Sequence, residues 1–182
     1  MIVTKSKILG LEIIQPIVYR DSRGYFFESY SELSFSKYIN KINFIQDNES
    51  KSIKGVLRGL HFQHPPFAQC KLVRCIKGEV LDIAVDIRKK SPTFGKYESV
   101  ILSEKNKKQF LIPEGFAHGY VVLSEEAIFA YKVNRLYSPK HEAGIIWNDP
   151  DLNIDWKISR NKLIISDKDQ NLLKLDNLKS SF

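Results

Sequence analysis

Short apolar runs, each closed by turn residues, follow one another along most of this chain. Typical strand-like runs are Tyr97–Leu102, His118–Leu123 and Ile128–Val133. Such a succession, with few helical periods, is typical of an all-β sandwich or barrel. Aromatic residues make up 12% of the chain, which favours the same class. We therefore expect one domain over residues 1–182, a double-sheet jelly roll with short peripheral helices.

Local patterns predict several individual elements. A strand over residues 8–19 is interrupted at Pro16, and a short helix over residues 31–39 has Ser31 as its cap. Leu33, Phe35 and Ile39 form the inward face of that helix. Two hairpins are expected, one joining Lys71–Ile76 to Glu79–Asp86 and one joining His118–Leu123 to Ile128–Val133.

Alternation in the run Glu79–Asp86 predicts a half-buried strand. Leu81, Ile83 and Val85 share one face, and the other face carries Asp82, Ala84 and Asp86. From residue 166 onward the chain is expected to be helical or irregular.

Charge and cysteine usage narrow the class of protein. The net charge is +7, but the lysines are dispersed and no nucleic-acid-binding motif occurs, so we expect no nucleic-acid partner. The excess of positive charge is explained either by a solubilising surface or by an anionic small ligand. No apolar run is long enough for a membrane span, and no membrane partner is expected. Cys70 and Cys75 should point to opposite faces of one strand, without a disulfide, as fits a reducing cytoplasm.

The stretch 55–74, GVLRGLHFQHPPFAQCKLVR, concentrates the polar groups that could carry chemistry. Burying a charge without a partner is expensive, so Arg58, His61 and Lys71 either face solvent or line a concave polar site. Arg58 and His61 are three apart and should lie on opposite faces, unless Gly59 forms a bulge that turns both into one pocket.

Other candidate residues have competing structural interpretations. Tyr131 suits a core ring with its hydroxyl at the rim. Asp169 follows Ser166 by three residues and resembles a capping box. His61 and His64 in HFQH are three apart, so they do not share a strand face as a metal-binding pair would, and we expect no metal.

A series of collinear motifs resembles the dTDP-4-dehydrorhamnose 3,5-epimerase family, the cofactor-free nucleotide-sugar epimerases of cupin-like fold. The motifs cover nearly the whole chain: DSRGYFFESY at 21–30, FIQDNES at 44–50, GVLRGLHFQ at 55–63, KLVR at 71–74, GEVLDIAVDIRKKSPTFGKY at 78–97, IPEGFAHGYVVLSE at 112–125, YKVNRLYSP at 131–139, IIWNDPDLNIDW at 145–156 and SDKD at 166–169.

The resemblance implies an enzyme of dTDP-rhamnose biosynthesis that inverts C3 and C5 of dTDP-4-dehydro-6-deoxy-D-glucose through an enolate. It implies His61 as base, Tyr131 as acid, Asp169 as the partner that orients His61, and Lys71 as stabiliser of the enolate oxygen. No cofactor and no metal are implied.

The same resemblance implies the residues that bind the substrate, a dTDP-4-keto-6-deoxyhexose. Arg23 and Arg58 would meet the diphosphate, Tyr137 would stack on the base, and His118 would lie beside the sugar. The remaining implied contacts come from Phe26, Glu28, Gln46, Asp47, Asn48, Glu142 and Lys168. The family also implies a homodimer with exchanged N-terminal strands, so some contacts are expected from the second subunit.

Three positions depart from the family pattern. Cys70 replaces a usual Gly, Phe67 stands where polar residues are common, and Tyr120 replaces a usual Phe. The first two put the sugar specificity in question, because a side chain there could narrow the pocket beside Lys71. The alternatives are an epimerase acting at C3 or C5 only, a 3,4-ketoisomerase, a metal-dependent cupin oxygenase, and a non-catalytic sugar-nucleotide-binding cupin.

Overall fold

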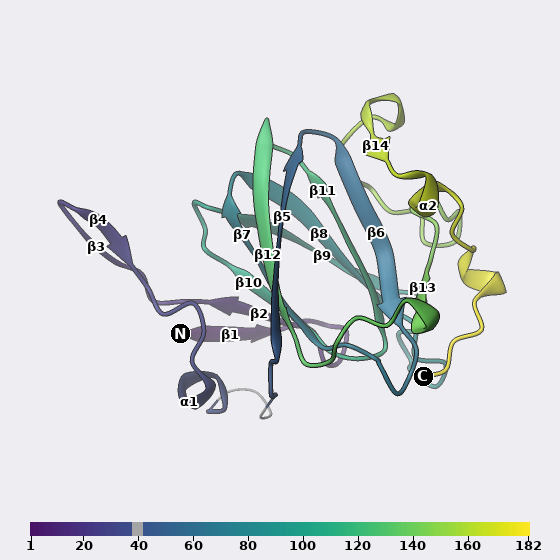
Figure 1. Ribbon diagram of the computed structural model, residues 1–182, viewed down its shortest axis with the longest axis horizontal. Coiled ribbons are helices and arrows are strands. Elements are labelled where there is room, and N and C mark those ends of the chain that lie inside the picture. Colours follow the sequence, from purple (N-terminus) through teal and green to yellow (C-terminus); the bar gives the residue numbers. More distant parts are fainter. Residues whose placement is uncertain (38–41) are drawn as a thin grey trace.

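Two β-sheets face each other in the computed structural model, which describes residues 1–37 and 42–182 (Figure 1). The first sheet contains, in order, β1 (Ile2–Lys5), β2 (Glu12–Gln15), β10 (Gln109–Ile112), β7 (Lys71–Lys77), β12 (Glu126–Val133) and β5 (Gln46–Ile53). The second contains β13 (Glu142–Gly144), β6 (Val56–Gln63), β11 (Phe116–Val122), β8 (Glu79–Asp86) and β9 (Tyr97–Ser103), and the short β14 (Ile164–Ile165) pairs with β6. The all-β, double-sheet jelly roll is confirmed.

The chain crosses between the two sheets after β7 and again after β11, so both predicted hairpins are wrong. β7 pairs with β10 and β12, whereas β8 pairs with β9 and β11 in the opposite sheet. β11 and β12 are separated in the same way, because β12 pairs with β5 and β7. Alternation reveals which side chains share a face, but it does not reveal the neighbouring strand.

The core lies in three layers. The inner layer, between the sheets, includes Val73, Phe110 and Phe129. A second layer covers the outer face of the second sheet, where the C-terminal segment contributes Trp156 and Leu175. The third lies under the N-terminal segment on the outer face of the first sheet.

β8 is sandwiched between two of these layers, which corrects the half-buried prediction. Val80 and Ala84 belong to the inner layer, and Leu81 and Ile83 belong to the layer under the C-terminal segment. Asp82 is consequently 0% exposed. A buried carboxylate in such a strand needs polar partners, and it finds them in the cleft described below.

The helices are single turns. α1 (Glu32–Phe35) is shorter than the helix expected over residues 31–39 and ends before Ser36. Ser31 is its N-cap, whose hydroxyl accepts the Ser34 N–H, and the helix buries Phe35 as predicted. Leu33 is 73% exposed instead of inward, because residues two apart on a helix point about 200° apart. Residue Ile39 of the same prediction lies outside the described residues. α2 (Asp167–Gln170) is capped by Ser166, and three 3-10 turns occupy Pro139–His141, Arg160–Lys162 and Leu175–Asn177.

A two-stranded hairpin, β3 (Tyr19–Asp21) and β4 (Gly24–Phe26), projects from the body (Figure 1). The predicted interruption at Pro16 is confirmed, since β2 ends at Gln15 and β3 begins at Tyr19. The strand expected from residue 8 is shorter than predicted, because β2 begins only at Glu12. Lys107 anchors the hairpin: its Nζ donates to the Tyr25 hydroxyl at 2.8 Å and lies 4.0 Å from the centre of that ring.

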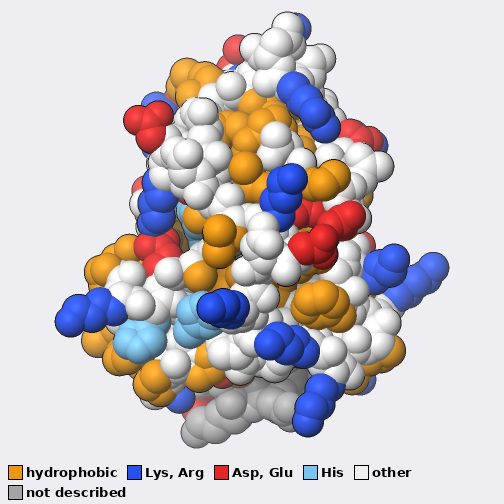
Figure 2. Space-filling view, turned by 90° about the vertical axis from the view of Figure 1, so that its right-hand side faces the viewer, with side chains coloured by type: hydrophobic (Ala, Val, Ile, Leu, Met, Phe, Trp, Pro, Cys, Tyr) orange, Lys and Arg blue, Asp and Glu red, His pale blue; other side chains and the backbone are white. Residues whose placement is uncertain are grey.

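Cysteine placement and surface charge follow the sequence-based expectations. Cys70 packs in the outer layer of the first sheet and Cys75 in the inner layer, and both are free thiols. Figure 2 shows Lys and Arg scattered among neutral and apolar side chains on the face it presents. No helix in residues 1–37 and 42–182 is long and apolar enough to cross a membrane.

Candidate active site

A cavity of about 570 Å³ opens between the two sheets, beside the edge strand β5. We call it the cleft. Its polar lining comes from five strands and the C-terminal segment, and includes Ser50, Arg58, His61, Lys71, His118, Tyr120, Tyr131, Lys168 and Asp169. All four residues expected to be catalytic therefore line one cavity, although 108 positions separate His61 from Asp169.

A bulge in β6 places Arg58 and His61 in the same cleft. His61 pairs with His118 and Arg58 with Tyr120, so β6 has one residue more than β11 between these pairs. Gly59 has the backbone conformation that the bulge needs, with φ of +131°. A side chain at this position would collide with the backbone of Gly119. Of the two alternatives left open by the sequence, the bulge at Gly59 is therefore the one that the structure has.

His61 and Asp169 form a short hydrogen-bonded pair. Nε2 of the imidazole lies 2.6 Å from Oδ1 of Asp169, and Oδ2 accepts the Gly59 N–H at 3.1 Å. The carboxylate is nearly buried, which by itself raises its pKa, but the His61 hydrogen bond and charge and the Gly59 N–H bring the pKa below its usual value. Ser166 caps α2 by accepting the Asp169 N–H, so the helix start positions the carboxylate.

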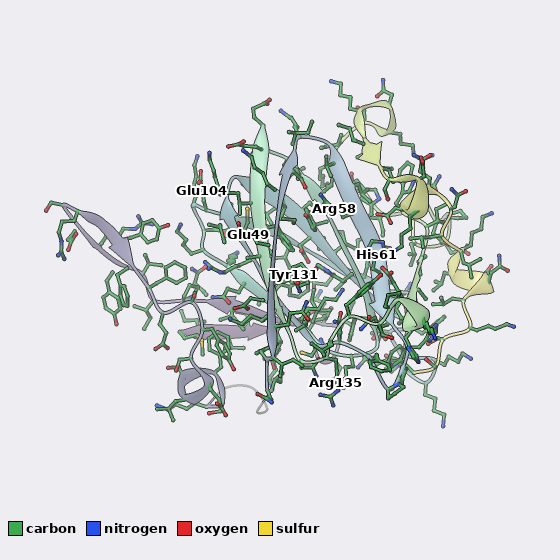
Figure 3. The ribbon with its side chains drawn as sticks, in the orientation of Figure 1. Glu49, Arg58, His61, Glu104, Tyr131 and Arg135 are labelled. Carbon is green, nitrogen blue, oxygen red and sulfur yellow. The ribbon has the colours of Figure 1, made fainter. Side chains whose placement is uncertain are left out.

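Tyr131 lines the cleft from the opposite sheet (Figure 3). It lies on β12 between Val73 of β7 and Asn48 of β5. Burial, followed by the neighbouring Tyr120, raises the pKa of its phenol, so the hydroxyl keeps its proton at neutral pH. An imidazole and a protonated phenol thus stand on opposite walls.

Lys71 enters the cleft as the first residue of β7. Burial lowers the pKa of its ammonium to about 8, against the opposing effects of Asp82 and Glu142. Among the described residues no side chain pairs with it at ion-pair distance. A desolvated, unpaired ammonium is suited to an anionic group of a ligand.

The buried carboxylate of Asp82 positions the imidazole of His118. Its Nε2 lies 3.0 Å from both carboxylate oxygens of Asp82. Burial is the main cause of both shifts: it lowers the pKa of His118 and raises that of Asp82. Asp82 is a site residue that sequence analysis missed, and its only signal was an acid within an otherwise apolar run.

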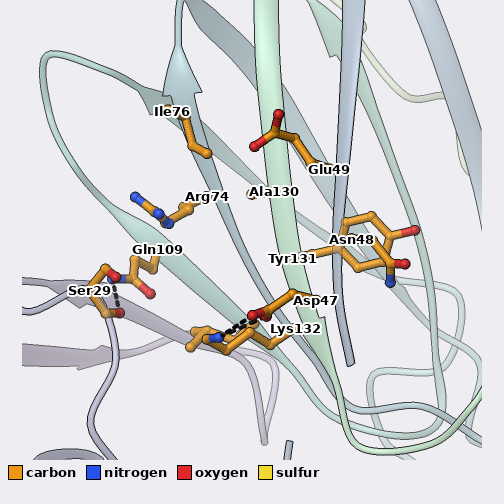
Figure 4. A pocket seen from close by; sticks show the side chains of 11 residues that line it. Ser29, Asp47, Asn48, Glu49, Arg74, Ile76, Gln109, Ala130, Tyr131 and Lys132 are labelled. Carbon is orange, nitrogen blue, oxygen red and sulfur yellow. Dashed lines mark hydrogen bonds and ion pairs between the residues drawn. The ribbon is translucent and has the colours of Figure 1, made fainter. Parts of the chain in front are cut away.

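The motif QDN splits between the two faces of β5. Gln46 and Asn48 are half-buried on the inner face, where Gln46 Nε2 donates to Asn48 Oδ1 at 2.8 Å. Asp47 faces outward and accepts Lys132 Nζ at 2.7 Å. Figure 4 shows Asp47 and Glu49 on one side of the strands and Asn48 and Tyr131 on the other. Strand alternation therefore keeps Asp47 out of the cleft.

Three further expected residues form the rim. The Tyr137 hydroxyl lies 2.5 Å from Glu142 Oε2, and the same oxygen is 2.6 Å from Lys168 Nζ. Burial would raise the pKa of Glu142, but Lys168 and then Tyr137 bring it below its usual value. Tyr137 is 54% exposed, so its ring face is open to a ligand.

The residues expected from the N-terminal strands lie elsewhere. Arg23, at the tip of the projecting hairpin, pairs with Asp21 at 2.6 Å, and Phe26 is 70% exposed. Phe26 and Glu28 line a separate cavity of about 400 Å³ with Tyr19 and Ile17. Within one chain the structure does not bring these three residues to the cleft.

Two of the three departures from the family pattern lie away from the cleft. Cys70 packs with Ile14 and Phe35 in the outer layer, where burial raises the pKa of its thiol to about 12. Phe67 packs against His141, with ring centres 4.5 Å apart. Tyr120, in contrast, lines the cleft.

In the parts of the chain that the structure describes, no three His, Cys, Asp or Glu side chains gather as a metal site requires. His64 forms a hydrogen bond with Ser181, with 2.7 Å between Nδ1 and Oγ.

A jelly roll with an imidazole–carboxylate pair facing a phenol across a polar cleft defines a class: β-sandwich enzymes of acid–base chemistry. Comparison with known proteins identifies the family. The model of the dTDP-4-dehydrorhamnose 3,5-epimerase family matches residues 5–177. The chain belongs to that family of isomerases.

Individual relatives agree with this assignment. The dTDP-4-dehydrorhamnose 3,5-epimerase of Shigella flexneri is 54% identical over 94% of both chains. A crystal structure of the Legionella pneumophila dTDP-6-deoxy-D-glucose-3,5-epimerase in complex with dTDP-4-keto-L-rhamnose has a TM-score of 0.92 and 47% identity, over 97% of this chain and 93% of that one. A more distant 3'-monoepimerase from Streptomyces bikiniensis, in complex with dTDP-quinovose, has a TM-score of 0.88 and 30% identity, over 94% of this chain and 86% of that one.

Proposed function

We propose that this chain converts dTDP-4-dehydro-6-deoxy-D-glucose to dTDP-4-dehydro-L-rhamnose by inverting C3 and C5, as a step of dTDP-rhamnose biosynthesis. The observation that carries the proposal is the cleft, in which the Asp169-bound imidazole of His61 faces the protonated phenol of Tyr131. Inversion of a carbon acid requires a base on one face and an acid on the other. The cleft offers both, and membership of the family supports the substrate.

The reaction we propose consists of proton transfers. Nε2–H of neutral His61 donates to Asp169, and Nδ1 takes the proton from a carbon α to the C4 ketone. The C–H bonding pair becomes an enolate whose charge rests on the C4 oxygen, where the Lys71 ammonium stabilises it. Tyr131 then gives its hydroxyl proton to the opposite face of the carbon, and solvent restores both groups. C3 and C5 flank the same ketone, so the His61–Tyr131 pair can invert both carbons. The reaction involves no net oxidation or reduction and needs no electron carrier.

The nucleotide binds, in this proposal, along the open side of the cleft. Arg58 is already oriented, because its Nε and Nη2 each lie 3.2 Å from Ser52 Oγ, and its guanidinium suits the diphosphate. Tyr137 stacks on the base, and Glu142 and Lys168 form the rim. His118 lies beside the sugar, and Gln46 and Asn48 approach the ligand from β5.

We infer that the active form is a homodimer in which the β3–β4 hairpin of one copy reaches the cleft of the other. Arg23, Phe26 and Glu28 are expected to bind substrate, yet in one chain they lie on the projecting segment. The exposed apolar surface of Tyr19 and Phe26, 63% and 70% exposed, supports a partner for this hairpin. A second copy supplies that partner by twofold symmetry.

We also infer a cytoplasmic location. Both thiols, Cys70 and Cys75, are free and buried, which suits a reducing compartment. A nucleotide-activated substrate fits the same compartment.

A reductase trap tests the reaction. The protein is incubated with dTDP-4-dehydro-6-deoxy-D-glucose and an NADPH-dependent 4-ketoreductase specific for the L-rhamno product. We expect NADPH oxidation and dTDP-rhamnose, identified by proton NMR. Recovery of a sugar inverted at one carbon would support the single-centre alternative, which the shared fold of the 3'-monoepimerase keeps as the second candidate. Unchanged substrate would contradict both.

A further inference from the structure

Tyr120 places a hydroxyl in the wall of the cleft. Its ring is 4% exposed and stacks on Phe129, with centres 4.1 Å apart and planes at 22°. The hydroxyl lies 2.8 Å from Oγ of Ser50 on the edge strand β5. The stack needs no hydroxyl, because a phenylalanine at position 120 would present the same ring to Phe129. The hydroxyl is therefore an addition that packing does not require.

The hydroxyl pair lies between the phosphate-binding and proton-transfer ends of the cleft. Side chains of Asn48, Ser50 and Ser52 alternate along the inner face of β5, and Asn48 pairs in register with Tyr131. Two residues further along from Ser50, Ser52 accepts the Arg58 guanidinium. On β11, Tyr120 itself pairs with Arg58. Ser50 and Tyr120 thus occupy the middle of the path from Arg58 to Tyr131.

The substrate of the proposed function has a matching group at that place. Between the phosphate-bearing C1 and the reacting C3 and C5 lie only C2 and the ring oxygen. A C2 hydroxyl both donates and accepts, whereas a ring oxygen only accepts. One hydroxyl proton is used within the Tyr120–Ser50 pair, and Ser50 Oγ also donates to the Phe129 carbonyl at 3.5 Å. The pair therefore presents lone pairs, which can accept from a C2 hydroxyl but not from a ring oxygen.

We propose that Tyr120 and Ser50 bind the C2 hydroxyl of the hexose and make this protein selective for 2-hydroxy over 2-deoxy sugars. The inference rests on the proposed function and adds a specificity determinant to it. A site built to bond a substrate hydroxyl rejects the analogue without it, because its own polar groups are then left unpaired.

The test compares two substrates across matched variants. kcat/KM is measured for dTDP-4-dehydro-6-deoxy-D-glucose and for its 2-deoxy analogue, with the wild type, Tyr120→Phe and Ser50→Ala. We expect the wild type to prefer the 2-hydroxy sugar by roughly 10²-fold, and each variant to reduce that preference to about tenfold. The loss should fall on the 2-hydroxy sugar, with the 2-deoxy rate within about twofold. Because the two hydroxyls act as a unit, the double variant should lose little more than either single one.

Tyr97→Phe is the matched control, since Tyr97 packs on the outer layer of the second sheet. It removes a hydroxyl outside the cleft and should leave both rates unchanged. An equal loss on both sugars in Tyr120→Phe would overturn the inference, because the hydroxyl would then act only on the shape of the wall. An unchanged preference would overturn it as well. In either case an active wild type leaves the proposed function intact, whereas a wild type inactive on both sugars would refute the reaction and this inference with it.

Discussion

The carboxylate of Asp169 accepts hydrogen bonds from two groups of the β6 bulge, the His61 imidazole and the Gly59 N–H. It therefore sets both the tautomer of His61 and the position of the strand that carries it. The interpretation of Asp169 as a mere capping residue is insufficient, because only its backbone N–H takes part in the cap.

Asp169→Asn should lower kcat by about 10²-fold or more, because the neutral amide no longer stabilises an imidazolium at His61. The affinity for dTDP should stay within about twofold, measured by calorimetry. Asp167→Asn, on the exposed side of the same helical turn, is the control and should keep full activity. Activity of Asp169→Asn within twofold of the wild type would contradict the orienting role.

The lowered pKa of Lys71 predicts a loss of activity at alkaline pH. Its ammonium has a pKa of about 8, so the charge that we propose to stabilise the enolate is present below that pH and lost above it. We expect kcat to fall as the pH rises through about 8, and Lys71→Met to abolish this limb together with most of the activity. A kcat that stays level up to pH 10 would exclude a role for this charge.

Burial of the Lys71 ammonium should also lower the free energy of unfolding. A lysine whose folded-state pKa lies below its unfolded value of 10.5 destabilises the native state fully below about pH 8. That penalty declines between the two pKa values and disappears above 10.5. Lys71→Met should therefore raise Tm at pH 7, and the gain should shrink as the pH rises from 8 to 10.5.

At the scale of elements, the β6 bulge decides whether Arg58 and His61 share the cleft. A Cβ on Gly59 would lie 2.5 Å from the Gly119 Cα, in addition to the backbone strain at φ of +131°. Gly59→Ala should lower the free energy of unfolding by about 3 kcal/mol or more and remove activity, measured by urea titration and the reductase assay.

Gly24→Ala is the control that separates the backbone strain of Gly59→Ala from its steric collision with Gly119. Gly24 has nearly the same φ, +133°, but nothing lies within 4 Å of an added Cβ. We expect a cost of about 1 kcal/mol, from backbone strain alone. Equal costs at the two positions would show that close approach to β11 does not constrain the bulge.

Strand positions were predictable from the sequence, whereas strand partners were not. The alternation from Tyr97 onward correctly indicated β9, but a two-residue connection such as Lys77-Gly78 looks the same whether the chain turns back or crosses to the other sheet. Asp82 looked exposed because the alternation suggested that the face with Leu81 and Ile83 was the only buried one. That face lies under the C-terminal segment, whereas Asp82 lies on the face toward the other sheet, beside His118. The bulge at Gly59 was within reach, since glycine between two functional residues is its signal.

The candidate site was predictable in its residues through the family resemblance, and its geometry depended on the fold. Spacing alone could not bring His61 and Asp169 to 2.6 Å, because that contact needs β6 and the C-terminal turn together. Nor could it place Asp47, which strand pairing turns outward. No role was assigned to the hydroxyl of Tyr120 from the sequence, and it became informative only beside Ser50.

At the scale of the whole molecule, the distance between the projecting hairpin and the cleft predicts that two copies share each site. Two inactive variants, His61→Ala and the double variant Arg23→Ala/Phe26→Ala, should restore activity when unfolded and refolded together. Half the dimers would then be mixed, each with one intact cleft served by an intact hairpin, giving about a quarter of the wild-type activity.

Each variant refolded alone is the control and should stay inactive. A mixture that also stays inactive, while analytical ultracentrifugation shows dimers, would mean that the hairpin serves its own cleft.

The central claim is that His61 and Tyr131 act on opposite faces of the sugar, and solvent exchange tests it most directly. Proton NMR in D2O follows deuterium at C3 and C5 of dTDP-4-dehydro-6-deoxy-D-glucose. We predict incorporation at both carbons with the wild type, none with His61→Ala at unchanged dTDP affinity, and, with Tyr131→Phe, exchange that persists while net inversion is impaired. Wild-type exchange in His61→Ala, or full epimerisation by Tyr131→Phe, would contradict the account.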